Sequence, residues 1–225
     1  MSKDVGSAEA GVRPLSYGLI LTMAVACGVA VANIYYNQPM LGVIKRDFAN
    51  SWWVGLIPTA TQIGYGLGLF LLVPLGDLMD RRRLIVGQFL LLGGASFAAS
   101  LAPNAAALVA ASLGGGACAS VAQQIIPFAA SLAAPEKRGR TIGTVMAGLL
   151  CGILLSRLLA GVVATYAGWR EMFQLGLPIS VGGAIAMAIA LPRNYPHTGL
   201  AYIEALKSLV HLWVAEPSLR RASLM

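Results

Sequence analysis

Arg157 is the residue of this chain that most requires a chemical explanation. It stands in an apolar, glycine-rich stretch from about Thr141 to Ala164, and an arginine near the centre of a bilayer costs at least about 2.5 to 3.5 kcal/mol on insertion scales. A helix rises about 1.5 Å per residue, which places Arg157 roughly 24 Å from Thr141, toward the far face of a membrane. The side chain therefore either reaches the lipid headgroups, or binds an anionic substrate group or polar atoms of another helix.

Amide side chains in other apolar stretches are the second set of candidates. Each amide can both donate and accept hydrogen bonds, so it could bind a hydroxyl or another polar group of a small molecule inside an apolar cavity. Hydrogen bonding between helices is the commoner use of such residues, and both interpretations stay open. The candidates for a substrate cavity, besides Arg157, are Asn33, Asn37, Gln62 and Gln124.

The predicted spans offer few residues that could act in catalysis or bind a metal. His197 and His211 both stand in the polar C-terminal tail, and Cys27, Cys118 and Cys151 have no paired spacing. The interiors of the apolar stretches contain no Asp or Glu to act as an acid, a base or a proton site. We therefore expect no enzyme, no metal site and no cofactor.

The composition indicates that membrane helices position these side chains. Of the 225 residues, 57% are hydrophobic and 11% are charged, a ratio unlike that of water-soluble domains. Uncharged intervals of 31, 29, 52 and 21 residues separate the charges, whereas a spanning helix needs about 20 apolar residues. The longest interval has a helix-breaking Pro103-Asn104 pair near its middle. These intervals predict five spans, and the stretch that holds Arg157 is a sixth candidate.

The distribution of basic residues favours six spans. Inner loops of membrane proteins retain Lys and Arg, and translocated loops are depleted of them. With six spans and an internal N-terminus, 12 of the 16 basic residues lie inside, and only Lys45, Arg46 and Arg170 lie outside. The sequence therefore predicts an all-α membrane protein with spans near residues 16–40, 53–75, 84–102, 105–131, 141–164 and 171–191.

The two ends of the chain are expected on the cytoplasmic side of a cell membrane, in a bacterium the inner membrane. Residues 1–15 form a polar N-terminus, and residues 192–225 form a cytoplasmic segment with helical apolar spacing from Gly199 to Val214, which predicts an amphipathic helix. The chain ends where a further span would follow. The net charge of +7 is spread over short loops, so anionic lipid headgroups are the expected partners and nucleic acid is not.

The loop between the second and third predicted spans carries a motif. It begins with Gly76, places Asp80 four residues later and continues with Arg81, Arg82 and Arg83. The pattern resembles the signature loop of the major facilitator superfamily, in which the glycine allows close helix approach and the acid pairs with basic groups to latch the inner gate. The second glycine of that signature is missing here. The alternative is that the three arginines serve only to orient the chain, with Asp80 offsetting one charge.

Two further segments resemble the same superfamily in the same order. Pro135-Glu136-Lys137-Arg138-Gly139-Arg140 is similar to its fourth loop, and Gly168-Trp169-Arg170-Glu171-Met172-Phe173 is similar to the start of its sixth helix. The segment from Ala32 to Pro39 resembles the drug and sugar efflux branch. This resemblance implies the N-terminal half bundle of a twelve-helix transporter, with the substrate bound between two halves.

The predicted fifth span also carries a packing motif. Gly148 and Gly152 form a glycine-x-x-x-glycine step, and small residues of this kind let helix backbones approach closely in lipid. The glycine-proline step of many antiporters is absent from this stretch, which leaves antiport undecided. The resemblance implies transport of a small molecule by alternating access, with efflux as the expected direction. The alternatives are a truncated chain that transports nothing, and a half-transporter that acts with a second six-helix half or as a homodimer.

Overall fold

The computed structural model describes residues 16–49, 51–192 and 202, and in these ranges the chain is helical without any strand. Six helical segments are long and apolar enough to cross a membrane, which confirms the predicted fold class. The N-terminal 15 residues and the expected amphipathic helix of the tail lie outside the described residues, apart from Tyr202. The six spans run over Tyr17–Asp47, Trp52–Leu78, Arg81–Ser100, Ala105–Leu132, Pro135–Tyr166 and Trp169–Ala190.

Each span consists of one to three helical elements. The first contains α1 (Tyr17–Tyr35) and α2 (Asn37–Asp47), and the second contains the 3-10 segment η1 (Trp52–Leu56), α3 (Ile57–Leu71) and α4 (Leu75–Leu78). The third is α5 (Arg81–Ser100), and the fourth contains α6 (Ala105–Ala119) and α7 (Ala122–Leu132). The fifth contains η2 (Pro135–Lys137) and α8 (Arg138–Tyr166), and the sixth is α9 (Trp169–Ala190).

Local chemistry fixes where several helices begin or break. Ser16, Asp80 and Asn104 cap α1, α5 and α6, because each side chain accepts a hydrogen bond from a backbone N–H of the first turn. The first span is interrupted at Tyr36, three residues before Pro39, whose missing N–H leaves the Tyr35 carbonyl without its helical donor.

Proline has a different effect in the second and fourth spans. Pro58 stands in the first turn of α3, where a missing N–H breaks no helical bond, whereas Pro127 is inside α7.

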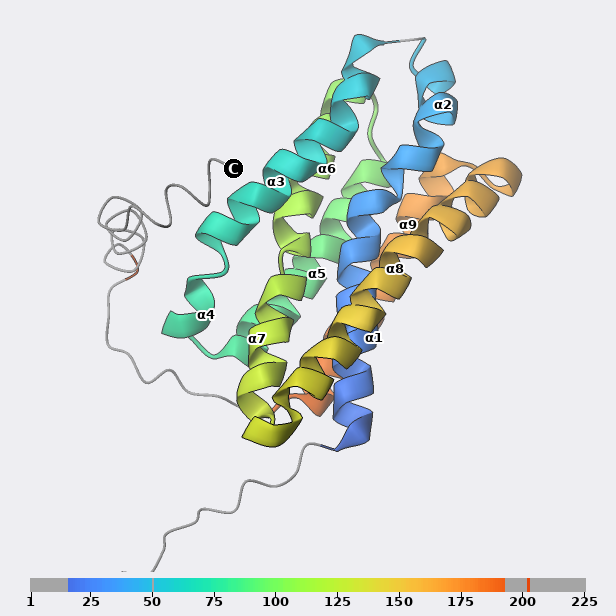
Figure 1. The fold of residues 1–225 in the computed structure, drawn as a ribbon. Helices are drawn as coiled ribbons and strands as arrows, with labels where there is room; N and C mark the ends of the chain where they lie inside the picture. Colours follow the sequence, from blue (N-terminus) through green and yellow to red (C-terminus); the bar gives the residue numbers. More distant parts are fainter. Residues whose placement is uncertain (1–15, 50, 193–201, 203–225) are drawn as a thin grey trace, which may run out of the picture.

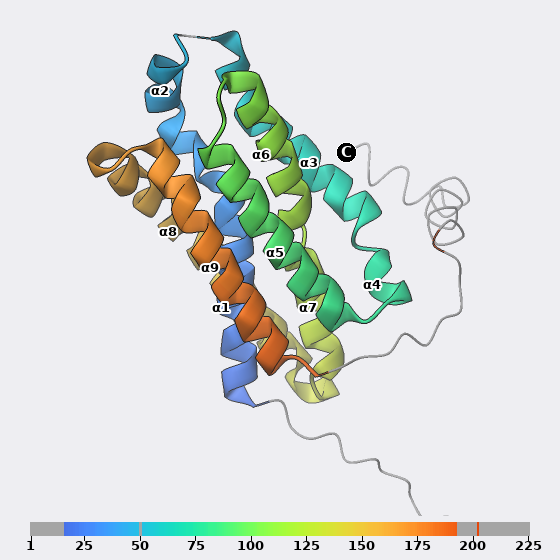
Figure 2. The same cartoon turned by 180° about the vertical axis from the view of Figure 1, so that it is seen from behind.

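The six spans form one bundle in which α1 packs on α8, α3 on α6, and α5 on α9. In Figure 1, α3 lies along one edge of the bundle and α8 toward the other, where it crosses α1, and α7 lies between α3 and α8. Figure 2 shows that α5 and α9 form the opposite side. The core consists of two apolar clusters, one around Phe89, Phe128 and Met23, the other around Trp169, Met40 and Leu108.

The charged loops gather at two ends of the bundle. We call the end that contains residues 76–83 and 135–140 the arginine end, and the end that contains residues 45–49, 51–53 and 167–170 the tryptophan end (Figure 1). The three basic residues expected outside the cell all lie at the tryptophan end, opposite the arginines of the signature loop. This arrangement agrees with the partition of charges in the sequence.

In two pairs of helices, α1 with α8 and α3 with α6, the two backbones are in direct contact. A Cβ atom on Gly152 would overlap Gly28 of α1, and a Cβ atom on Gly148 would overlap Ala24. In the other pair, Gly64 and Gly68 of α3 lie directly against the backbone of α6, while Gly116 of α6 lies against α3. We call these contacts the α1–α8 seam and the α3–α6 seam. Close packing of this kind supplies helix association in lipid, where the hydrophobic effect does not.

Candidate functional site

Arg157 contacts polar atoms of the first span. Its Nη2 donates a hydrogen bond to Gln38 Oε1 at 3.1 Å, and its guanidinium lies 5.3 Å from the centre of the Tyr35 ring. The side chain is nonetheless exposed, on a helix whose neighbouring exposed residues are leucines. Charged groups within membrane spans normally face a water-filled cavity or another part of the protein rather than lipid. This side of α8 is therefore a candidate for a substrate-facing or subunit-facing surface.

Gln62 is the other cavity candidate with an exposed side chain, on α3. The outer sides of α5 and α9, in contrast, expose large apolar residues such as Leu90, Leu91 and Ile185. Arg157 and Gln62 thus belong to α8 and α3 (Figure 1), not to the α5–α9 side.

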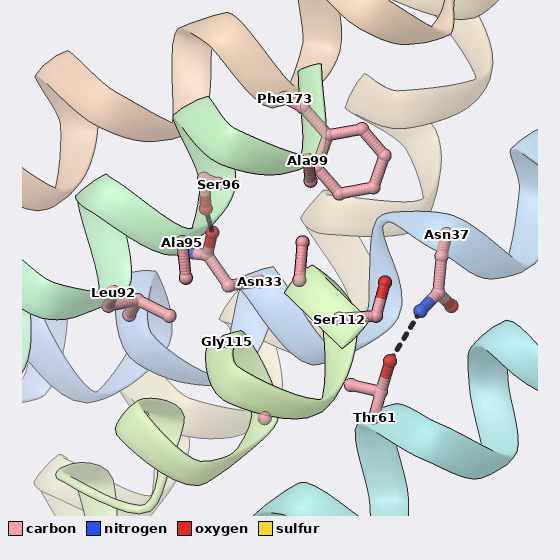
Figure 3. A pocket seen from close by; sticks show the side chains of 12 residues that line it. Asn33, Asn37, Thr61, Leu92, Ala95, Ser96, Ala99, Ser112, Gly115 and Phe173 are labelled. Carbon is pink, nitrogen blue, oxygen red and sulfur yellow. Dashed lines mark hydrogen bonds between the residues drawn. The ribbon is translucent and has the colours of Figure 1, made fainter. Parts of the chain in front are cut away.

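Asn33 and Asn37 lie inside the six-helix bundle instead of on its surface. Asn33 Oδ1 accepts a hydrogen bond from Ser96 Oγ at 2.9 Å, and Asn37 Nδ2 donates one to Thr61 Oγ1 at 2.9 Å. These bonds join the first span to the third and the second. Both residues line a small cavity together with Ser112 of α6 (Figure 3).

The size of that cavity limits what it can hold. Its volume is about 20 Å³, which is room for about one water molecule, whereas ligand pockets usually measure about 300–1,000 Å³. Asn33 and Asn37 therefore do not line a substrate-sized pocket in this conformation. Their hydrogen bonds join neighbouring spans within the bundle.

Gln124 takes part in a second buried network near the arginine end. Its Nε2 donates to Gln88 Oε1 at 2.7 Å and to the Leu72 carbonyl at 3.2 Å. Gln88 in turn lies 3.5 Å from Ser120 Oγ. The network joins the second, third and fourth spans beneath the signature loop, because Gln124 Oε1 would be 3.4 Å from a Cβ atom on Gly76. A side chain at position 76 would thus be in ordinary contact with the amide.

The signature loop is held together mainly by its own residues. Asp80 caps α5 by accepting from the Arg82 amide at 3.0 Å, and its other oxygen is 3.9 Å from Arg83 Nε. Arg81 donates to the Gly76 carbonyl at 3.0 Å and forms an ion pair of 2.6 Å with Asp77.

The Arg82 guanidinium donates to the carbonyl of Ala188 in α9. The loop is thereby tied to the sixth span. The acid next to the arginines serves as a helix cap here, and Asp77 binds Arg81. Sequence reasoning assigned no role to Asp77.

A cluster at the tryptophan end was missed by sequence reasoning. Asp47 Oδ2 accepts from Trp169 Nε1 at 2.8 Å and from Arg170 Nη1 at 3.0 Å, and Arg170 Nη2 donates to the Ala102 carbonyl at 3.3 Å. The Arg170 guanidinium also lies 4.2 Å from the centre of the Trp169 ring. These contacts join the ends of the first, third and sixth spans. The motif around Trp169 was recognisable, but nothing in the sequence indicated that Asp47 would be its partner.

Replacing Asp47 by alanine is expected to lower the free energy of unfolding by about 1–2 kcal/mol, because the buried Trp169 Nε1–H loses its acceptor. The ion pair with Arg170 adds little, since both side chains are more than a third exposed. Thermal unfolding of the purified chain measures the effect. Asp47→Asn is the matched control, because it keeps an oxygen acceptor, and it should retain most of the stability. Equal losses in the two variants would contradict the importance of the indole hydrogen bond.

The fold and these sites define a polytopic membrane protein with a small-residue helix bundle and an exposed intramembrane arginine. Residues 18–216 match the Major Facilitator Superfamily. Because this match covers most of the sequence, the chain belongs to that superfamily of transporters.

Relatives from several bacteria agree with this assignment. The uncharacterized transporter YgaY of Escherichia coli O157:H7 is 41% identical over 212 residues, which are 94% of this chain and 54% of YgaY. The lincomycin resistance protein of Streptomyces lincolnensis is 31% identical over 78% of this chain and 36% of its own length. The multidrug resistance protein B homolog of Mycobacterium tuberculosis H37Rv is 29% identical over 81% and 35% respectively. The chain thus spans about half the length of YgaY and a little over a third of the length of the other two relatives.

Proposed function

We propose that this chain forms one half of a transporter that exports a small molecule by alternating access across the bacterial inner membrane. Arg157 carries the proposal, because a charged side chain exposed within a span requires an aqueous or protein environment. The named relatives include resistance proteins, which favours export as the direction. Both termini would then lie in the cytoplasm, since the arginine end holds six of the ten basic residues in the described part of the chain.

The second and fifth spans are the expected contact surfaces for the other half. Only 28% and 22% of their most apolar windows are buried, compared with 50% in the first span. Their exposed side chains include Ile63 and Phe70 on α3, and Leu154 and Leu158 on α8. A second six-helix unit would cover these apolar surfaces and enclose Arg157 and Gln62 between the two units.

The second unit can be a second copy of this chain or a second half of the same fold. In either case a two-fold axis along the membrane normal would place α3 of one unit against α8 of the other, because α3 lies along one edge of the same side and α8 toward the other (Figure 1). The seams indicate which residues share a depth. Gly68 packs beside Ser120, Cys27 Sγ contacts the Ala122 carbonyl, and Gly28 packs on Gly152. Phe70 and Cys151 therefore lie at similar depth.

A disulfide test follows for the homodimer alternative. In Phe70→Cys membranes treated with a mild oxidant, we expect a covalent dimer, because the introduced thiol would meet Cys151 of the partner subunit, which is exposed in the monomer. Non-reducing electrophoresis measures the yield. Adding Cys151→Ser should remove the dimer band. If Phe70→Cys gives no dimer, pairing of two copies of this chain through α3 and α8 is contradicted.

Export itself can be measured with two fluorescent probes. Cells without their major efflux pumps are loaded with neutral Nile red or with anionic carboxyfluorescein, and the dye retained is followed with and without the expressed protein. Faster loss of either dye supports export. Unchanged retention of both dyes in cells that express the chain, alone and with a second half from a relative, would contradict the proposal.

A further inference from the structure

Two buried oxygen atoms at the small cavity in the middle of the bundle lack a hydrogen-bond partner among the described residues: Asn37 Oδ1 and Ser112 Oγ. Asn37 is 2% exposed and Ser112 is 7% exposed. Buried polar atoms in native proteins are nearly always satisfied, so each such atom indicates an additional partner. In Figure 3 the Ser112 side chain points from α6 toward the Asn37–Thr61 pair.

The other polar groups around the cavity are already engaged with the protein. Asn37 Nδ2 donates to Thr61 Oγ1, which in turn donates to the Ile57 carbonyl at 2.9 Å. Asn33 Nδ2 donates to the Val29 carbonyl at 3.0 Å, and its oxygen accepts from Ser96. The cavity thus presents one carbonyl acceptor and one hydroxyl to a guest. The remaining lining is apolar, and none of the lining residues is charged.

We propose that one structural water molecule occupies this cavity, donates a hydrogen bond to Asn37 Oδ1 and exchanges a second one with Ser112 Oγ. The volume of about 20 Å³ accommodates about one water molecule. A transported molecule is too large, and a metal cation would find too few oxygen ligands and no negative charge.

This water has a specific place in the fold. Asn37 is the first residue of α2, directly after the break of the first span at Tyr36. Ser112 belongs to α6 in the fourth span. Through the water, the outer segment of the first span gains a hydrogen bond to the fourth span, at a level where the two apolar clusters of the core meet. The inference rests on this geometry and is independent of the proposed transport.

Alanine substitutions at Gly115 and Gly114 provide a test, because a water-filled cavity and an empty cavity predict Tm changes of opposite sign for Gly115→Ala. Gly115 lines the cavity, and a Cβ atom added there would be 3.7 Å from the Ala95 Cβ, an ordinary contact. Gly114 is its neighbour on the same helix, and a Cβ atom there would meet nothing within 4 Å. Alanine favours a helix over glycine at both positions. In a dry cavity, Gly115→Ala would also fill apolar space and stabilise the chain further.

With a resident water, Gly115→Ala narrows the cavity and displaces the water from both oxygen atoms. We expect the Tm of the purified full chain to fall by about 2–4 °C in Gly115→Ala and to stay or rise by a similar amount in Gly114→Ala. In a Ser112→Ala background, the decrease in Tm caused by Gly115→Ala should be less than half as large. In that background the water has already lost its hydrogen bond to Ser112 Oγ and is weakly held. A rise in Tm for Gly115→Ala would overturn the proposal, and so would an equal loss in both backgrounds, which indicates a steric cause.

A high-resolution map of the protein gives a direct second measurement that does not depend on variants. The proposal expects a density peak within about 3.2 Å of both Asn37 Oδ1 and Ser112 Oγ, and this peak should be absent from a map of Gly115→Ala. A well-ordered map without that peak would contradict the proposal even if the Tm values agreed with it.

Discussion

Replacing Gly152 by leucine is expected to prevent the chain from reaching its native fold. Gly152 lies in the α1–α8 seam, where even a single Cβ atom would overlap the Cα, carbonyl carbon and oxygen of Gly28. These are backbone atoms, so no side-chain rotation can relieve the overlap. Overpacking commonly costs about 1–3 kcal/mol, and a clash between two backbones should cost about 3 kcal/mol or more. We expect little monodisperse protein in size-exclusion chromatography, and a strongly lowered Tm in what remains.

Gly161→Leu is the matched control for that experiment. Gly161 lies on the same helix, but a Cβ atom there would meet nothing within 4 Å. The variant introduces the same side chain into the same span and should elute and unfold like the parent chain. If both leucine variants behave alike, the tight packing of α1 on α8 is not a determinant of folding.

Replacing Arg157 by alanine is expected to reduce export at least about tenfold, equivalent to about 1.4 kcal/mol of lost stabilisation. The change removes the hydrogen bond to Gln38, the stacking on Tyr35 and the charge exposed within the fifth span. Initial rates of dye export at equal membrane content measure the effect. Leu91→Ala is the control, because this apolar residue of α5 is 63% exposed on the α5–α9 side, away from the proposed contact surface, and its rate should stay close to that of the parent.

The two dyes separate the two roles that Arg157 can have. If the guanidinium attracts an anionic group of the substrate, Arg157→Ala should slow carboxyfluorescein more than Nile red. If it closes a gate by holding Gln38, both dyes should slow equally, and Arg157→Lys should restore only part of the rate, because lysine lacks the planar fork of donors. Unchanged export of both dyes by Arg157→Ala would show that the residue has no role in transport.

Much of the architecture could be predicted because membranes impose simple rules. Spans must be long and apolar, and basic residues mark one side. These two rules were enough to predict six helices, including the fifth, which carries Arg157. They could not predict the break at Tyr36, because a proline in a span can bend, end or begin a helix depending on what packs beside it. Pro39 follows a break, whereas Pro58 begins α3.

The candidate site was harder to predict, since the type of a residue does not tell which way its side chain points. Asn33 and Asn37 are as polar as Gln62, yet they face other helices while Gln62 is exposed. That difference depends on the rotation of each helix about its axis, which tertiary packing sets. Asp47 was missed for a related reason, because its partners Trp169 and Arg170 are more than 120 residues away.

The two seams also limit how the six-helix bundle can move. Each seam consists of glycine and backbone atoms, so no side chain can change rotamer to make room when one helix slides along the other. Sliding would therefore bring the two backbones into collision. The six spans should consequently tilt together as one rigid body, so that the arginine end and the tryptophan end move in opposite directions. Bending would then be concentrated at the breaks within the described spans, at Tyr36 in the first span, between α3 and α4, and between α6 and α7.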